Sequence, residues 1–316
     1  MSRFVIVVFA VLASFASTCV LAQANYPNRP IRLITPAAPG GTTDILARLF
    51  GARMSENFKQ QVIVDNRASA SGVNAAEIVA HSQPDGYTLF LPFVQHTVNA
   101  ALNPNLPYKV VDDFTPVAQL TAGGMMLLVH PSSPVKTVKE FVEWVKTYKG
   151  PLNYGSAGLG SGGHLAGEML NQMAGIKAQH IPYKGAGPAM IDLVGGQYQF
   201  GFAGMQGSQV QVRAGKLRAL AVTTPKRVGV MPDLPTMAEV LPGFDVVGWY
   251  GVLGPARLPK DIVTKLNTEL LRILALPEVR ERIVADGSEP VGSAPEEFRK
   301  YLLADVAKWK RLIKPE

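Results

Sequence analysis

Two segments of the sequence join a glycine-rich turn to the start of a helix, and both carry hydroxyl side chains. The first is TPAAPGGTTDILARLF, residues 35–50, in which two glycines precede Thr42 and Thr43. The second is NYGSAGLGSGGHLAGEML, residues 153–170. A helix start offers unpaired N–H groups and the positive end of the helix dipole, and glycines let an anion approach them. Each loop alone is explained equally well as a tight turn, but the two together favour a cleft for an anionic ligand.

The candidate binding residues of these loops are those nearest the two helix starts. They are Gly40, Gly41, Thr42, Thr43, Ser156, Ala157, Gly158, Gly160, Ser161 and His164. Asp44 lies in the first turn of the first helix, where its charge suits the helix dipole but would repel a carboxylate. We therefore interpret Asp44 as a helix cap or a brace of the loop.

Nucleotide motifs are absent or incomplete in the sequence. Residues 158–163 match the dinucleotide fingerprint G-x-G-x-x-G, but the next strand ends at Tyr183 and Lys184, where an acidic ribose partner is expected. The phosphate loop G-x-x-x-x-G-K-[ST] does not occur. We therefore expect no cofactor.

Catalytic constellations are equally weak. Ser156 and Ser161 lack the G-x-S-x-G turn that exposes a nucleophilic serine. His164 and Glu168 lie one helical turn apart without a third metal ligand, so no metal is expected. An enzyme is disfavoured. A secreted hydrolase remains the alternative, and it requires Ser156, Ser161 and His164 to meet within hydrogen-bonding distance. The other histidines are read as ordinary ones, except that His96 and His180 stay open as pocket residues.

The elements that would position these residues alternate between short apolar strands and amphipathic helices. The predicted strands are Ile31–Thr35, Gln61–Asp65, Tyr87–Pro92, Met125–His130, Leu152–Tyr154, Gln179–Pro182, Gln199–Phe202, Leu217–Thr223 and Val246–Leu253. The predicted helices among them are Thr43–Met54, Thr137–Tyr148, His164–Met173 and Pro188–Val194. This alternation is typical of βαβ units and predicts an α/β fold with mostly parallel, doubly wound sheets.

The C-terminal part of the chain is predicted to be helical. Asp261–Ala275 carries an apolar stripe, and a second helix begins at Pro277 and ends before Gly287. The segment 293–296, Ser-Ala-Pro-Glu, reads as a capping box before a third amphipathic helix. We interpret these helices as a layer that packs against the rest of the fold and contributes no functional residues.

The first 24 residues resemble a secretory signal. Arg3 supplies the positive charge, Phe4–Val20 is apolar, and Ala22-Gln23-Ala24 fits a cleavage site. Export would remove Cys19, the only cysteine, so the mature chain would have no disulfide. We expect a periplasmic protein of 316 − 24 = 292 residues. A retained membrane anchor is the alternative, although the apolar run is short and is broken by Ser and Thr.

The composition is typical of a globular protein, and the distribution of charge argues against nucleic-acid binding. Apolar residues make up 47% of the chain, and its length favours two domains. The expected mature charge is (31 − 1) − 24 = +6, from basic residues that form no long run. Such a surplus suits solubility and a mild attraction of anionic solutes. We expect a monomer.

Several segments of the chain resemble the extracytoplasmic receptors of tripartite tricarboxylate transporters, the Bug family. The segments are YPNRPIRLITPAAPGGTTDILAR, VIVDNRASASGVNAAEIVAHSQPDGYTL, LPYKVVDDFTPVAQL, LNYGSAGLGSGGHLAGEML, HIPYKGAGPAMIDLVGGQ, GKLRALAVTTPKR and MPDLPTMAEVLPGF. Their order is specific, and the resemblance runs from Tyr26 nearly to the end.

The resemblance implies a type II periplasmic-binding-protein fold, two doubly wound lobes with a cleft between them. We assign residues 25–122 plus 246–316 to one lobe and 123–245 to the other. It also implies a small carboxylate held by loop backbone groups, hydroxyls and waters at 38–44 and 156–161, which adds Ala38 and Pro39 to the candidates. The membrane subunits of a transporter would be the partner, and a sensory module is an alternative.

Two departures from the family pattern bear on the ligand. Ala37 replaces a usual aromatic residue, and Ala203-Gly204-Met205 replaces a frequent acidic and polar pair, so Ala203 and Met205 become candidates. A larger or partly apolar carboxylate, such as an aromatic acid, would fit these changes, although neutral drift explains them equally well.

The remaining candidates follow strand ends. They are Phe93, Gln95, His96, Tyr183 and Lys184. Packing of the 93–96 loop against its own lobe is a slightly favoured alternative for the first three. Lys184 is a candidate distal partner of the ligand, although most lysines are simply solvated.

Overall fold

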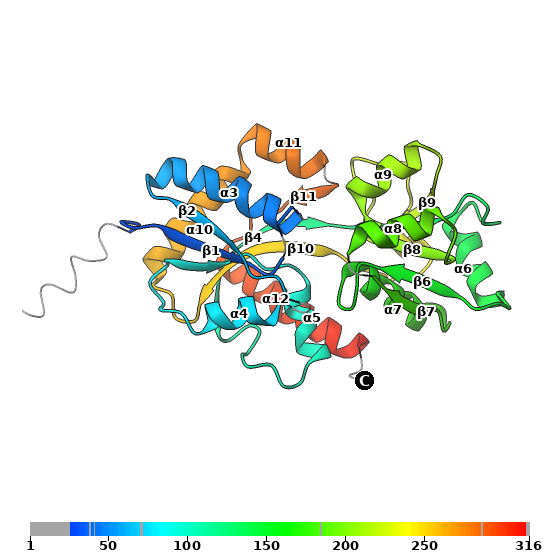
Figure 1. Ribbon diagram of the computed structural model, residues 1–316, viewed down its shortest axis with the longest axis horizontal. Coiled ribbons are helices and arrows are strands. Elements are labelled where there is room, and N and C mark those ends of the chain that lie inside the picture. Colours follow the sequence, from blue (N-terminus) through cyan, green and yellow to red (C-terminus); the bar gives the residue numbers. More distant parts are fainter. Residues whose placement is uncertain are drawn as a thin grey trace, which may run out of the picture.

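The computed structural model describes residues 26–37, 39–40, 42–69, 72–183, 185–285 and 287–313, except for the side chain of Gln206. In this part of the chain two α/β lobes lie side by side along the long axis of the molecule (Figure 1). Each lobe is built around one sheet, and we name them the first and the second lobe in chain order. The predicted signal lies outside the described residues. Within them, no helix has the length and apolar character needed to cross a bilayer.

The first lobe contains a six-stranded sheet in the order β11-β4-β10-β3-β1-β2. Its strands are β1 (Ile31–Thr35), β2 (Val62–Asn66), β3 (Thr88–Phe90), β4 (Phe114–Gly123), β10 (Gly248–Pro255) and β11 (Ser288–Pro290). Its helices are α3 (Thr42–Phe58), α4 (Val73–Ala80), α5 (Gln95–Leu102), α10 (Lys260–Leu274), α11 (Pro277–Ala285) and α12 (Pro295–Leu312). One core gathers side chains of α3, α10 and α11, and another gathers those of α4, α5 and α12. The sheet is therefore covered on both faces.

The second lobe contains a five-stranded sheet in the order β7-β6-β8-β5-β9. Its strands are β5 (Met125–Val129), β6 (Asn153–Ser156), β7 (Gln179–Pro182), β8 (Phe200–Gly204) and β9 (Arg218–Val222). Its helices are α6 (Val138–Thr147), α7 (Gly162–Ala174), α8 (Ala186–Val194), α9 (Met205–Arg213) and the short η1 (Met237–Glu239). Strand β5 is buried along its whole length, which is why it reads as a continuous apolar run.

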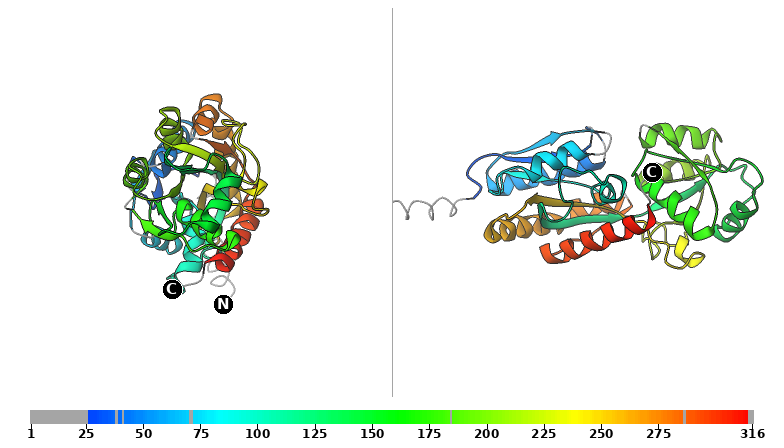
Figure 2. Two further views of the ribbon diagram at one scale, coloured as in Figure 1. Left: turned by 90° about the vertical axis from the view of Figure 1, so that its right-hand side faces the viewer. Right: turned by 90° about the horizontal axis from the view of Figure 1, so that it is seen from below.

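The chain crosses between the lobes at two adjacent places. It leaves the first lobe from β4 to β5, and it returns through residues 246–248 into β10. Thr223 joins the two crossings, because its hydroxyl accepts the N–H of Met125 at 2.9 Å and donates to the carbonyl of Val246 at 2.6 Å. Helix α12 runs along the first lobe and reaches α7 of the second (Figure 2).

Both sheets are mixed, so the prediction of mostly parallel sheets was wrong. The pairs β1–β2, β1–β3, β6–β7 and β6–β8 are parallel. The pairs of β10 with β3 and β4, of β11 with β4, and of β5 with β8 and β9 are antiparallel. The cause is the double crossing, since β4 leaves the first lobe and its neighbour β10 runs back into it.

Several elements escaped prediction, and one cap was misplaced. Strands β4 and β11 and helices α4, α5 and α9 were not foreseen: α4 and α5 are only 8 residues long, and the apolar residues of the others are few or interrupted by proline and glycine. The capping box predicted at 293–296 is not formed, because the residue that precedes α12 is Ala294, which has no side-chain acceptor. Glu297 accepts the N–H of Ala294 at 3.0 Å, while the Ser293 hydroxyl accepts the N–H of Gln119 at 2.9 Å.

Candidate functional site

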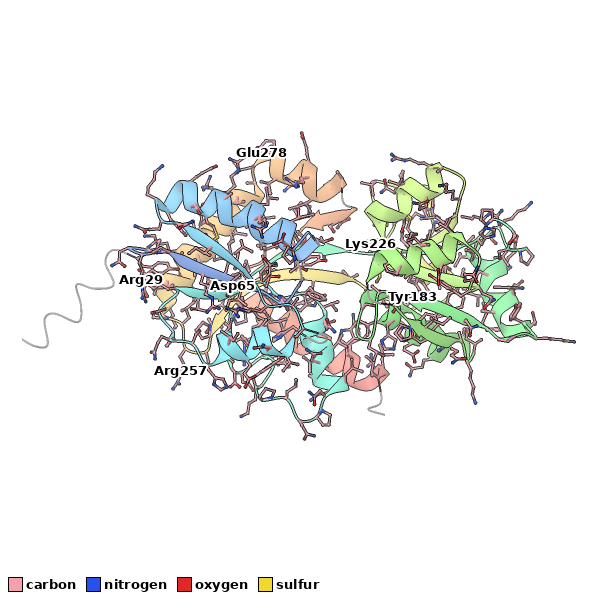
Figure 3. The ribbon with its side chains drawn as sticks, in the orientation of Figure 1. Arg29, Asp65, Tyr183, Lys226, Arg257 and Glu278 are labelled. Atoms are coloured by element: carbon pink, nitrogen blue, oxygen red, sulfur yellow. The ribbon has the colours of Figure 1, made fainter. Side chains whose placement is uncertain are left out.

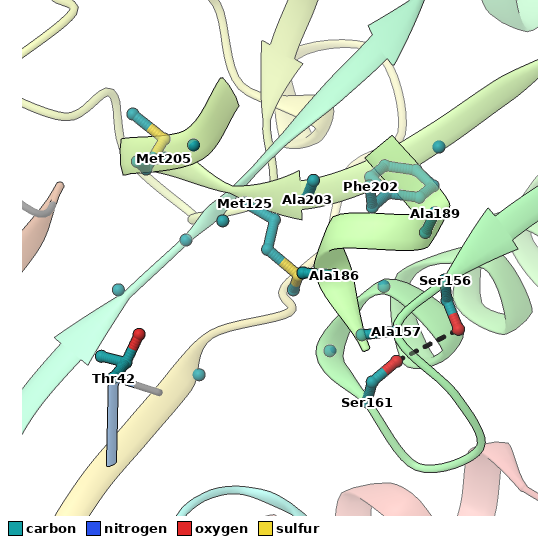
Figure 4. A pocket seen from close by; sticks show the side chains of 18 of the residues that line it. Thr42, Met125, Ser156, Ala157, Ser161, Ala186, Ala189, Phe202, Ala203 and Met205 are labelled. Atoms are coloured by element: carbon teal, nitrogen blue, oxygen red, sulfur yellow. Dashed lines mark hydrogen bonds between the residues drawn. The ribbon is translucent and has the colours of Figure 1, made fainter. Parts of the chain in front are cut away.

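A cavity of about 380 Å³ lies between the two lobes, a size typical of small-molecule sites. The first lobe contributes Thr42, Phe93, Val94, Gly248, Trp249, Tyr250 and Ser288 to its wall. The second lobe contributes residues of the 155–163 segment, of α8, and of β8 with the start of α9. Met125 and the glycines before it line the cavity where the chain first crosses. In Figure 4, Thr42 lies across the pocket from Ser156 and Ser161.

Four helices begin at this cavity. Thr42 opens α3, Gly162 and Gly163 open α7, Ala186 opens α8 and Met205 opens α9, and all five residues line the wall. Their first-turn N–H groups have no partners within the helices, and their dipoles place positive potential at the cavity. The sequence predicted the starts of α3 and α7. The glycines around Ala186 and after Phe202 were signals that could have indicated the other two.

Ser156 organises the loop before α7. Its hydroxyl oxygen accepts the N–H of Gly158 at 3.1 Å and the hydroxyl of Ser161 at 3.1 Å, and it lies 2.6 Å from Nε2 of His180. A serine hydroxyl has one donor and two acceptor positions, so these three contacts occupy all of its hydrogen-bonding positions. Ser161 in turn caps α7, accepting the N–H of His164 at 3.4 Å. The hydroxyls thus fix the backbone that faces the cavity.

The Ser156–His180 pair differs from a catalytic pair in its electrostatics. Burial, together with the neighbouring His164, whose ring centroid is 4.3 Å away, lowers the pKa of His180 to about 4. A general base for neutral pH needs a pKa near 7. Nδ1 of His164 accepts the N–H of Gly160 at 3.2 Å, so its described role is also to shape the loop. These contacts favour a binding loop over a hydrolase.

The free energy of unfolding below pH 7 should depend on the imidazoles of His96 and His180. Burial also lowers the pKa of His96 to about 4. Between pH 6.5 and about 4 the unfolded chain protonates His96 and His180, whereas the folded protein keeps them neutral. The free energy of unfolding should therefore be highest above pH 6.5. It should decrease on acidification by up to about 2.7 kcal/mol per pH unit, because the unfolded chain binds two more protons than the folded protein. Urea unfolding at pH 7, 6 and 5 measures this slope.

The matched variant for this slope is His180→Asn, which removes one of the two titrating groups. The slope between pH 6 and 5 should then fall by about half. An unchanged stability of the parent protein from pH 7 to 5 would contradict the assignment of neutral buried imidazoles.

The first loop is braced as predicted for Asp44. Its carboxylate accepts the N–H of Gly40 at 2.9 Å, Nε of Arg48 at 3.0 Å and Nδ2 of Asn66 at 3.0 Å. The hydrogen bond from Arg48 is the largest cause that lowers the pKa of Asp44 to about 2. Asp44 therefore stays ionised and tied to its loop, and Thr42 is left to face the cavity.

The lobes touch on two sides of the cavity. Nε2 of Gln95 donates to the carbonyl of Leu159 at 3.3 Å, which links α5 to the second lobe. A β-carbon built on Gly287 would lie 2.1 Å from Cβ of Met205, so the start of α9 packs against the first lobe. These contacts enclose the space between Thr42 and Ser161.

The structure places the predicted site residues in three groups. Those that line the cavity are Thr42, Phe93, Ser156, Ala157, Ser161, Ala203 and Met205. Those that lie behind or beside the wall are Pro39, Gly40, Thr43, Gln95, His96, Gly158, Gly160, His164 and Tyr183. Ala38, Gly41 and Lys184 lie outside the described residues. Several apolar wall residues were not foreseen, among them Met125, Leu193, Tyr198 and Trp249.

His96 and Tyr183 illustrate the second group. His96 is buried, with Nε2 2.9 Å from the carbonyl of Val110 and its ring packed between aromatic neighbours of the first lobe. Tyr183 lies on the second lobe (Figure 3), where its hydroxyl donates to Asp192 at 2.7 Å. Both side chains stabilise the lobes that carry the wall.

This fold and this cavity define a two-lobed solute-binding protein. The chain belongs to the tripartite tricarboxylate transporter family of receptors, whose family model matches residues 46–316. The periplasmic binding protein BugD is 34% identical, over 91% of this chain and 97% of BugD, with a TM-score of 0.78. The predicted Bug-family membership and the periplasmic-binding-protein fold are thereby confirmed.

Two further structures of this fold contain a ligand. Rpa4515 of R. palustris, solved with adipate, is 35% identical, over 91% of this chain and 97% of its own, with a TM-score of 0.81. MatC of Rhodopseudomonas palustris, solved with bound malate, is 34% identical, over 92% of this chain and 100% of its own, with a TM-score of 0.79. Both ligands are small organic carboxylates.

Proposed function

We propose that the protein binds a small organic carboxylate in the periplasm and delivers it to the membrane subunits of a tripartite tricarboxylate-type transporter. The observation that carries the proposal is the convergence of four helix starts on one cavity between two lobes. Adipate and malate in related structures support the chemical class of the ligand. The receptor family supports a role in binding rather than in catalysis.

The carboxylate would lie between the start of α3 and the start of α7. There Thr42, Ser161 and the first residues of α7 line one cavity, and the hydroxyl of Ser161 donates to Ser156 in the described structure. Charge-assisted hydrogen bonds from such groups satisfy a carboxylate without a fixed cation. The lobes 25–122 plus 246–316 and 123–245 would close over the ligand by a hinge at the two crossings, acting as a monomer after signal cleavage near Ala24.

Calorimetric titration tests the proposal. The protein lacking residues 1–24 should bind at least one member of a panel of monocarboxylates, dicarboxylates, tricarboxylates and aromatic acids. A bound ligand should also raise the melting temperature in a concentration-dependent way. Absence of heat and of a thermal shift for every member of the panel would refute carboxylate binding.

A further inference from the structure

The wall of the cavity is more apolar away from the starts of α3 and α7. Among its described residues, none is Asp, Glu, Lys, Arg or His. Of its hydroxyl-bearing residues, Thr42, Ser156 and Ser161 belong to the carboxylate end, and Tyr198, Tyr250 and Ser288 lie elsewhere in the wall. The opposite part is lined by Ala189, Leu193 and their neighbours on the second lobe, and we call this part the apolar end.

Tyr198 forms the floor of the apolar end. Its side chain is 2% exposed, and its hydroxyl donates to the carbonyl of Ala189, so its ring rather than its hydroxyl faces the cavity. Gly155 allows this position, because a β-carbon there would lie 2.3 Å from the tyrosine ring. The absence of a side chain at Gly155 therefore lets the Tyr198 ring lie against the cavity.

Methionines and alanines complete the apolar end. Ala203 and Met205 lie beside the pocket in Figure 4, and Leu193 is 2% exposed. The Met125 side chain lies between the two ends, because a β-carbon on Gly162 would be 2.5 Å from its Cε atom. Thioether side chains adapt to irregular apolar shapes, and alanines leave room for a bulky group. Ala203 carries no group that could pair with a charge or a strong donor on the ligand.

A second carboxylate would find fewer donors at the apolar end than at the starts of α3 and α7. Helices α8 and α9 begin there without a side-chain cap, so their first-turn N–H groups are open, but their wall residues Ala186 and Met205 add no hydroxyl donor. The third residue of α8 is Pro188, which has no N–H. Burying an anion without a full set of donors or a counter-ion is strongly unfavourable.

We propose that the ligand is an amphipathic monocarboxylate, whose carboxylate lies at the α3 and α7 starts and whose uncharged, apolar tail fills the apolar end. This rests on the proposed function, since it names the substrate class of the same site. A receptor for a dicarboxylate would need hydrogen-bond donors or cations at both ends of its cavity, and this wall has them mainly at one end. Aliphatic and aromatic tails both meet the requirement.

Matched ligand pairs test the proposal by calorimetry on the protein lacking residues 1–24. Hexanoate is compared with adipate, and 4-methylbenzoate with terephthalate, so that each pair differs by a methyl group against a carboxylate at the far end. The monocarboxylate should bind at least tenfold more tightly in at least one pair. Tighter binding of the dicarboxylates, or binding of tricarboxylates alone, would overturn the monocarboxylate while leaving carboxylate binding intact. No binding of any carboxylate would refute both.

The variant Ala203→Asp adds a charge to the apolar end. It should weaken binding of the preferred monocarboxylate at least tenfold, while the neutral variant Ala203→Asn, of similar size, should weaken it less. Equal effects of the two variants would assign the loss to bulk alone and would count against an uncharged, apolar end. Thermal unfolding of each variant confirms that it is folded.

Discussion

Gly163→Ala should raise the Kd for the best-bound carboxylate about 100-fold. A β-carbon at this position would lie 2.5 Å from the carbonyl oxygen of Phe202 and 3.2 Å from Cβ of Ser156. Both contacts are with strands of the second sheet, so the start of α7 must move away from them. Two charge-assisted hydrogen bonds from the displaced N–H groups represent about 3 kcal/mol, which corresponds to that change in Kd. Calorimetric titration measures it.

Two glycine variants serve as controls. Gly187→Ala lies in the first turn of α8, where an added β-carbon meets no atom within 4 Å, so binding should change less than threefold. At Gly162 the added β-carbon would meet only the end of the Met125 side chain, which can rotate away. Gly162→Ala should therefore have an intermediate effect. A Kd of Gly163→Ala equal to that of Gly187→Ala would show that the start of α7 does not bind the carboxylate.

The sequence predicted the short strands of the βαβ units better than strand β4, which leads into the hinge. Ile31–Thr35 and Gln179–Pro182 were predicted with their observed bounds. Strand β4 was missed because proline, glutamine and threonine interrupt its apolar residues, although it pairs along its length with β10. That pairing joins residues more than 120 positions apart, and a local pattern holds no information about it.

The carboxylate end of the site was predictable for a similar reason. A glycine loop before a helix is a local signal, and Thr42, Ser156 and Ser161 all reach the cavity. The apolar end was not, because Tyr198 and Leu193 read as ordinary core residues of the second lobe. Only the packing of α8 against β6 and β8 turns part of that core into a cavity wall.

Asp305→Ala should lower the free energy of unfolding by about 3 kcal/mol, the largest loss we expect from a residue outside the cavity wall. Asp305 lies in α12 and is 3% exposed. Its carboxylate accepts the Thr97 hydroxyl at 2.6 Å and Nε1 of Trp249 at 3.0 Å, and it pairs with Lys308 at 3.3 Å. Removal would leave the buried Nε1 of Trp249 without its acceptor and would unpair a cation, while the Thr97 hydroxyl keeps the carbonyl of Val94 at 2.8 Å as its acceptor. Urea unfolding measures the loss.

Two carboxylate variants separate this network from a general charge effect. Asp305→Asn keeps an acceptor oxygen and should lose about half as much stability. Asp112→Ala breaks the exposed pair with Arg299 and should cost less than about 1 kcal/mol. Because Asp305 fixes both α5, which carries Gln95, and β10, which crosses between the lobes, its loss should also weaken carboxylate binding. Stability of Asp305→Ala equal to that of Asp112→Ala would mean that apolar packing alone holds α12 in place.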